Sequence, residues 1–230
     1  MVKRISQIDH ARISEAIRAA ESQTSGEIFC VLAREVSSYR DISLLWAAGL
    51  AFIVPLGLIA LGFNASWIPG ISTGWDAAHL AGRLTETSQS LAAYALVQVA
   101  VFIFCYAALR LPMLRRLATP RGVRRARVRK AALHQFLAHG LHVTEERTGV
   151  LIFAALEDHQ VEVIADSGIH SRVDQSVWAQ AVEALTDGLG SNRPADGFEA
   201  AIGLVGEVLA EHFPPRPRNP NEIADRLVEI

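Results

Sequence analysis

The sequence contains little cysteine and little charge, and each shortage excludes a class of protein. Its 230 residues include 2 cysteines, 16 glycines and 9 prolines, which is too few for a disulfide scaffold or a collagen-like chain. Apolar residues make up 50%, so the chain can bury enough surface to fold and is not globally disordered. Charged residues make up only 20%, below the usual share in soluble domains, which points toward a membrane protein.

Acidic residues are absent from residues 110–130, although the whole chain has a net charge of −2. This segment, the basic belt, holds nine of the 22 basic residues. Such a belt indicates an anionic partner. Because it adjoins an apolar run and has no interleaved aromatic residues, we expect phospholipid and not nucleic acid. The residues expected to bind anionic phospholipid are Arg115, Arg116, Arg121, Arg124, Arg125, Arg127, Arg129 and Lys130.

Two long apolar runs predict transmembrane helices. Residues 42–63 contain no charge and would extend roughly 33 Å as a helix. Residues 91–109 have Gln98 as their one strongly polar member and would extend about 29 Å. Both lengths suit a hydrocarbon core of ~30 Å. We therefore expect spans at 42–63 and 91–113, joined by a connector over residues 64–90.

The charges beside these runs predict their orientation. The connector has a single basic residue, Arg83, whereas Arg34 and Arg40 precede the first run and the belt follows the second. The positive-inside rule then places both termini in the cytoplasm and the connector outside. The first residues, MVKRISQIDHARIS, lack an apolar segment, so we expect no cleavable signal peptide.

The remaining residues predict alternating helices and strands. Helical periodicity begins near Ser6, a candidate N-cap, and recurs in residues 121–139, where Leu133, Phe136 and Leu137 are expected on the buried face. Two further helical patterns precede and follow Pro194. Strand patterns occupy residues 27–36, 148–156 and 160–166. The first 41 residues are too few for a core of their own, so we predict one cytoplasmic α/β domain made of residues 1–41 and 114–213 and interrupted by the membrane hairpin.

The last 17 residues, 214–230, predict a stiff proline-rich arm followed by a short helix. Ile223, Leu227 and Ile230 recur near one face of that helix. A helix this short is marginal alone in water, so its apolar face is expected to bind a partner or to dock on its own domain, and a frayed end is the simplest alternative.

Three short motifs resemble the TPM domain family. They are TSGEI at residues 24–28, TGVLI at 148–152, and VEVIADSGI at 161–169. Residues 140–142 and 147–149 resemble a bacterial membrane subgroup of the family. The resemblance implies an α-β-α sandwich, here interrupted by a two-helix transmembrane hairpin, in the inner membrane of a bacterium. Most relatives carry the domain whole and exported, so lumenal or periplasmic roles are not carried over.

The resemblance leaves two functions open. Some relatives act as accessory or assembly factors for membrane complexes, and acid phosphatase activity with divalent-metal binding is attributed to plant members. The acidic hairpin supplies candidate Ca²⁺ or Mg²⁺ ligands, namely Asp158, His159, Glu162 and Asp166. No nucleophile–base pair, P-loop or nucleophile elbow is present in the sequence. We therefore expect a noncatalytic accessory or interaction factor for a membrane protein complex, with a divalent-metal-dependent, acid phosphatase-like hydrolase as the alternative.

Overall fold

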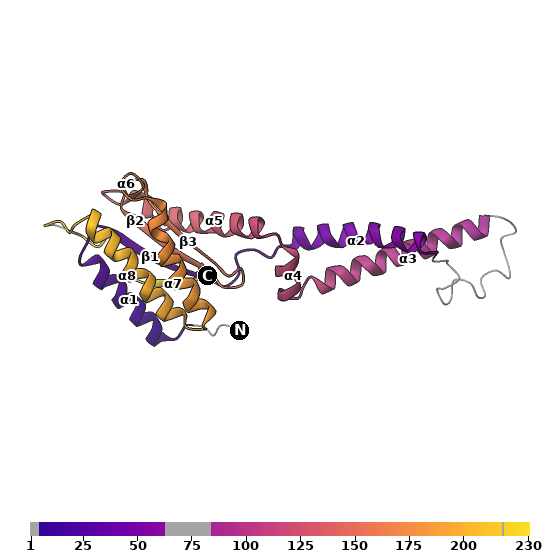
Figure 1. Ribbon diagram of the computed structural model, residues 1–230, viewed down its shortest axis with the longest axis horizontal. Helices are drawn as coiled ribbons and strands as arrows, with labels where there is room; N and C mark the ends of the chain where they lie inside the picture. The colour runs from indigo at the N-terminus through magenta and orange to yellow at the C-terminus, as the bar shows by residue number, and fades with distance from the viewer. Residues whose placement is uncertain (1–4, 63–83, 218) are drawn as a thin grey trace. The chain divides into compact units, whose positions relative to one another are not determined.

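The computed structural model describes residues 5–62, 84–217 and 219–230, which form two compact units (Figure 1). Met1–Ser38 and Arg121–Ile230 together form one unit, which we call the α/β unit. Tyr39–Pro120 form the other, the helical unit. The helical unit is thus inserted into the sequence of the α/β unit, at the place where the apolar runs predicted an interruption.

The α/β unit contains a four-stranded sheet of order β3-β2-β1-β4. Its strands are β1 (Glu27–Ala33), β2 (Gly149–Ala155), β3 (Gln160–Ala165) and β4 (Leu227–Glu229). β1 is parallel to both β2 and β4, whereas β2 and β3 form an antiparallel hairpin. β1 pairs with β2 along its full length, so the segments before and after the helical unit build a single sheet.

The strand β4 corrects the expected terminal helix. Residues 219–230 contain no helix, and Leu227–Glu229 instead extend along β1. Arg34 donates its backbone N–H to the Ile230 carbonyl over 2.8 Å, and Ile230 donates to the Leu32 carbonyl over 3.0 Å. The edge of β1 would otherwise carry unpaired backbone groups, so pairing there outweighs a marginal local helical preference.

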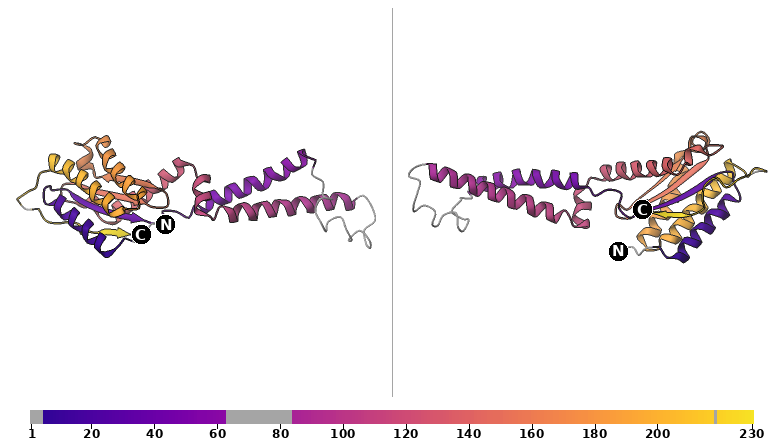
Figure 2. Two further views of the ribbon diagram at one scale, coloured as in Figure 1. Left: turned by 60° about the horizontal axis from the view of Figure 1, so that its bottom comes forward. Right: turned by 180° about the vertical axis from the view of Figure 1, so that it is seen from behind.

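Helices cover both faces of the sheet, because β1 and β2 are apolar on both sides. Ile28, Cys30 and Leu32 point into a core shared with α1 (Gln7–Glu21), α7 (Ala179–Gly190) and α8 (Pro194–His212). Phe29 and Val31 point into a second core shared with α5 (Arg121–Ala138). Figure 2 shows α5 on one face and the other three helices on the opposite face. The α/β unit is therefore a mixed α/β fold with its sheet between two helical layers.

Close backbone contacts pack the three-helix layer. A Cβ atom added to Gly188 of α7 would lie 2.5 Å from the Gly197 Cα of α8. A Cβ atom added to Gly206 of α8 would lie 2.8 Å from the Ala20 Cβ of α1. Both distances are too short for a side chain, so glycine permits α8 to approach both neighbours.

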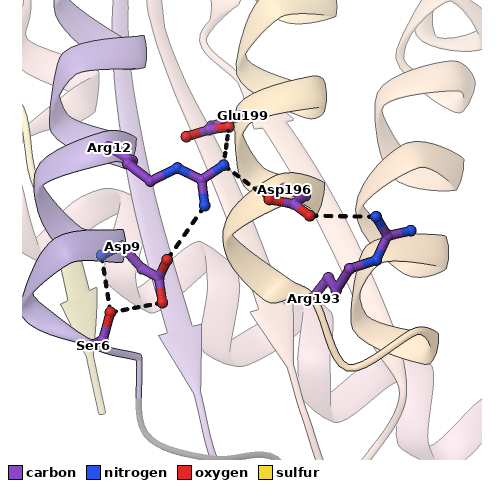
Figure 3. Close-up of polar contacts among 6 residues, drawn as sticks. All are labelled: Ser6, Asp9, Arg12, Arg193, Asp196 and Glu199. Carbon is purple, nitrogen blue, oxygen red and sulfur yellow. Dashed lines mark hydrogen bonds and ion pairs between the residues drawn. The ribbon is translucent and has the colours of Figure 1, made fainter.

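A surface network joins the first turns of α1 and α8 (Figure 3). Ser6 caps α1 as the sequence predicts, because its Oγ accepts the Asp9 N–H over 3.1 Å. Arg12 then donates to Asp196 over 2.9 Å and to Glu199 over 2.8 Å. These groups are exposed, so the network fixes the register between the two helices more than it stabilises the fold.

The helical unit contains α2 (Arg40–Ala60), α3 (Leu84–Ala108) and α4 (Pro112–Ala118). The buried residues of α2 are Ser43, Ala47, Ala51 and Pro55. Their spacing of four places them in one row, and small side chains there allow α3 to pack closely. The Tyr94 hydroxyl of α3 donates to the Pro55 carbonyl over 3.3 Å.

Two helices are long and apolar enough to cross a membrane, at Arg40–Ala60 and Leu91–Ala108. Most of the connector expected over residues 64–90 lies outside the described residues, but α3 already begins at Leu84. The second helix ends at Ala108 and not at residue 113, because the chain turns before Pro112 and starts α4. Pro112 has no N–H to donate and occupies the first position of the new helix.

Candidate functional site

The structure does not bring the four expected metal ligands together. His159 is exposed in a tight turn with φ of 48°, and Asp158 beside it is buried. Asp166 caps α6 (Ser167–His170) by accepting the Ser167 N–H over 2.6 Å. Glu162 lies four residues earlier along the chain, about 13 Å away at ~3.3 Å per strand residue. Over the described parts of the chain, no three His, Cys, Asp or Glu side chains form a group that could hold a metal ion.

Glu162 instead pairs with the basic belt. Its carboxylate lies 3.8 Å from the Arg125 Nε and 3.5 Å from an Arg129 Nη of α5. Arg124 points inward from α5, is buried, and donates to the Asp158 carbonyl over 3.4 Å. The acidic hairpin and the basic helix therefore neutralise part of each other's charge, although the sequence predicted two separate sites there.

The eight expected lipid-binding residues divide into three sets. Arg115 and Arg116 belong to α4 in the helical unit. Arg124 and Arg127 are turned toward the α/β unit, where Arg127 donates to the Ser37 Oγ over 2.7 Å. The exposed basic residues of α5 are Arg121, Arg125, Arg129 and Lys130. Arg124 is therefore a residue of the fold and not of a lipid-facing surface.

The outward side of α5 is also apolar over its second half. Leu133 and Leu137 were expected on the buried face, but 47% and 50% of their surfaces are exposed. The buried row is Arg124, Val128, Ala132 and Phe136, a spacing of four that turns Leu133 and Leu137 outward. We call the exposed basic residues of α5 together with Leu133 and Leu137 the α5 outer face. Cations beside apolar side chains are the pattern that binds an anionic membrane surface.

A second feature escaped the sequence analysis: buried carboxylates hold the C-terminal arm. Glu27, the first residue of β1, is buried and accepts the N–H groups of Glu222 over 3.3 Å and Ile223 over 3.2 Å. Glu21 accepts the Ile28 N–H over 2.7 Å. Burial, assisted by the nearby Glu27 and Asp225 carboxylates, raises the pKa of Glu21 to about 9. Local sequence patterns do not mark Glu21 and Glu27 as buried, because residues 222–225, which lie near their carboxylates, come from the far end of the chain.

The arm uses its apolar residues within its own domain. Leu227, in β4 beside β1, is buried in the core shared with α1, α7 and α8, and Ile223 packs against the core on the α5 side. Ile230 remains half exposed, at 51%. The expected helical face of Ile223, Leu227 and Ile230 is therefore not present as a partner-binding stripe.

Comparisons with known proteins find a domain match and a similar fold. Residues 117–208 match the family model of the TPM domain. The NMR structure of the BA42 protein from the psychrophilic bacterium Bizionia argentinensis superposes with a TM-score of 0.55 and 16% sequence identity, covering 99% of this chain and 97% of that chain. A search of curated proteins finds no match.

The matched segment runs from the end of α4 into α8 and includes the β2–β3 hairpin, where the family motifs were noted. β1 lies outside the match in sequence but pairs with β2 at the centre of the sheet. The similarity to BA42 concerns the fold. Both findings agree with the resemblance that the motifs of the hairpin indicated: residues 117–208 match the TPM domain, and the fold resembles that of BA42.

Proposed function

We propose that this chain is a TPM-domain protein of the bacterial inner membrane that acts as a noncatalytic accessory or interaction factor for a membrane protein complex. α2 and α3 would anchor it and the α/β unit would lie in the cytoplasm. The observation that carries the proposal is the outward orientation of the apolar side chains on both anchoring helices.

The exposure of those side chains favours a membrane hairpin over two alternatives. A core helix of a soluble protein is mostly buried, whereas only 22% of the apolar stretch of α2 and 6% of that of α3 is buried. Phe52, Leu56 and Phe104 are each at least 64% exposed. A signal sequence lies near the N-terminus, but α2 follows a complete strand of the sheet. Exposed apolar rows of this length favour contact with lipid.

The charges around the hairpin support the orientation. Arg34 and Arg40 flank the start of α2, and Arg110, Arg115 and Arg116 follow α3. A cytoplasmic α/β unit satisfies the positive-inside rule at both ends. It would also place the α5 outer face where anionic lipid is abundant, at ~1 kcal/mol for each basic residue near the surface.

An interaction role is supported by how the ionisable residues are used. Glu162 forms ion pairs with two arginines, and Asp166 accepts a hydrogen bond from the N-terminus of α6. Both carboxylates therefore have structural contacts. The exposed Leu133 and Leu137 offer an apolar contact outside the core.

The anchorage is tested by expressing the full chain in a bacterial host. We expect the chain to stay in the membrane pellet after alkaline carbonate extraction. We also expect activity from a reporter fused after Ile230 when the reporter is one that functions in the cytoplasm, and no activity from one that functions only outside the membrane. Recovery in the soluble fraction would disprove the anchorage, and a reporter active only outside the membrane would reverse the orientation. The wild type and the double variant Leu133→Ser plus Leu137→Ser are then purified in mild detergent. A membrane protein that co-purifies with the wild type and not with the variant binds through the α5 outer face.

The hydrolase alternative rests on Asp166, whose Oδ2 is buried and has no hydrogen-bond partner among the described residues. The purified protein should show no chelator-sensitive phosphatase activity under the accessory proposal. Asp166→Asn and Asp174→Asn form a matched pair, since both aspartates accept a backbone N–H as a cap but Asp174 is exposed. The accessory proposal would be wrong if the protein had phosphatase activity that EDTA and Asp166→Asn abolish but Asp174→Asn leaves unchanged. The hydrolase alternative would then hold.

A further inference from the structure

The short helix α4 and the residue before it present large apolar side chains that are exposed. Met113 is 84% exposed and Leu117 85% exposed, with Leu111 at 58% just before the helix and Leu114 at 39%. No residue of α4 is buried. Four large apolar side chains within seven residues are unusual on a surface that faces water.

These side chains form one side of an amphipathic turn. At about 100° per residue, Met113 and Leu117 superpose along the helix and Leu114 lies next to them. Arg115 falls on the opposite side, and Arg116 lies at the border between the two sides. Apolar residues on one side with arginines on the other are typical of a helix that lies along a membrane surface.

Contacts within the helical unit fix α4 beside the start of α2. The Trp46 indole N–H donates to the Ala118 carbonyl over 2.9 Å. Trp46 is six residues after the first residue of α2, about 9 Å along its axis. Tyr106 lies at the end of α3 and Arg110 follows the helix, with its guanidinium 5.8 Å from the Tyr106 ring centre. Tryptophan, tyrosine and arginine are the side chains enriched where a transmembrane helix meets the headgroups.

We propose that α4 is an interfacial helix lying in the cytoplasmic leaflet at the boundary between acyl chains and headgroups, an inference that rests on the proposed membrane anchorage. Met113, Leu114 and Leu117 enter the top of the acyl layer, and Arg116 reaches the lipid phosphates. The membrane-crossing part of the second helix then ends at Ala108, and α4 runs along the surface to the start of the α/β unit. The anionic bilayer occupies this apolar surface, since α4 follows α3 after a turn of three residues and carries Arg116 at its border and Arg115 on its other side.

The test measures the depth of single labels in the full-length protein. Met113→Cys and Leu117→Cys are each made in a Cys105→Ala background, and Cys30 stays because it is fully buried. Each thiol receives an environment-sensitive fluorophore, and the protein is reconstituted into vesicles of phosphatidylethanolamine and phosphatidylglycerol. Nitroxide lipids quench from the headgroup, from the top of the acyl chain, or from the bilayer centre. Phe52→Cys in the middle of α2 and the exposed Ala19→Cys on α1 serve as membrane and water controls.

We expect labels at Met113 and Leu117 to lose most fluorescence to the quencher at the top of the acyl chain, and the label at Phe52 to lose most to the central quencher. If Met113 and Leu117 resemble Ala19, with no quenching by lipid, α4 lies in water and the proposal fails while the anchorage stands. If they resemble Phe52, α4 is part of the span and the proposal also fails. If the Phe52 label itself is not quenched by lipid, the anchorage fails.

A second measurement tests the role of Arg116. Replacing phosphatidylglycerol by a neutral lipid should shift the Leu117 label toward water, and Arg116→Gln should reduce that shift. Arg193→Gln, which removes an exposed arginine outside the basic belt, is the charge-matched control and should leave the shift unchanged. A Leu117 label whose depth is the same in anionic and neutral vesicles would overturn the part of the proposal that concerns phosphate.

Discussion

The Glu27 carboxylate accepts the backbone N–H of Ile223 over 3.2 Å, although 196 positions separate the two residues. The same carboxylate accepts the Glu222 N–H, and Asn219 donates its side-chain amide to the Thr24 carbonyl over 3.0 Å. These bonds hold the C-terminal arm across the start of β1 and lead it into β4. The arm is therefore a structural part of the α/β unit.

Shortening the arm should destabilise the α/β unit. Leu227→Ala removes a buried side chain beneath β1 and should lower the free energy of unfolding by about 2–4 kcal/mol. Deleting residues 219–230 should lower the melting temperature further, because it also exposes the edge of β1. Ile230→Ala is the control, since its half-exposed side chain should cost little. Thermal unfolding of the detergent-purified chain measures all three, and an unchanged melting temperature after the deletion would show that the arm is not docked.

Glu21 should make stability depend on pH. Its pKa rises from the usual 4.5 to about 9, chiefly through burial, so between these values the folded protein holds a proton that the unfolded chain releases. The stabilisation is complete below pH 4.5 and is lost as the pH rises through the folded pKa. Glu21→Gln mimics the protonated side chain, whose amide can donate to Asp225 while its oxygen accepts from Ile28.

The measurement is the free energy of unfolding in urea from pH 5 to pH 9. The wild type should lose stability across this range, and Glu21→Gln should flatten the curve and be the more stable protein at pH 9. Glu15→Gln, on an exposed position of the same helix, should reproduce the wild-type curve. Parallel curves for wild type and Glu21→Gln would refute the prediction.

The contact between α7 and α8 should tolerate no side chain at Gly188. Gly188→Ala forces a methyl group against the backbone of Gly197 and should destabilise by about 1–3 kcal/mol. Gly203→Ala is the matched control in α8, because nothing lies within 4 Å of its added Cβ, and it should stabilise by about 0.5–1 kcal/mol through helix propensity. Chemical denaturation separates the two variants by the sign of the change.

Substitutions at Arg124 and Arg121 should change the free energy of unfolding by different amounts, although both residues belong to the basic belt. Arg124→Gln removes a buried side chain that donates to the Asp158 carbonyl and should cost about 1–3 kcal/mol. Arg121→Gln is exposed and should stay within about 0.5 kcal/mol of the wild type. Equal stabilities of the two variants would contradict the burial of the Arg124 side chain.

Local sequence was enough to predict three strands, one helix cap, the two long apolar helices and the resemblance to the TPM domain. Strands β1 and β2 were predicted from continuous apolar runs, and β3 from an alternating pattern with one solvated face. The Ser6 cap followed from short-range hydrogen bonding. The two long apolar helices followed from length and composition alone, and the TPM motifs were noted in the hairpin that the family match includes.

Other features depended on neighbours that are distant in sequence. The pairing of Glu162 with Arg125 and Arg129 required α5 to lie across β3, so two charge clusters that looked like separate sites became one. The outward turn of Leu133 and Leu137 depended on which row of α5 meets the sheet, which periodicity alone did not resolve because an apolar row existed on each side.

Sequence by itself determined three of the four strands, the two helices that are apolar enough to cross a membrane, and the interruption of the α/β domain by those helices, because these properties depend on local composition and periodicity. Tertiary structure decided the rest. The last residues became a strand because the free edge of β1 offered hydrogen bonds that a short helix could not match. Glu21 gained its high pKa because folding closed the arm over it and removed water from its carboxylate.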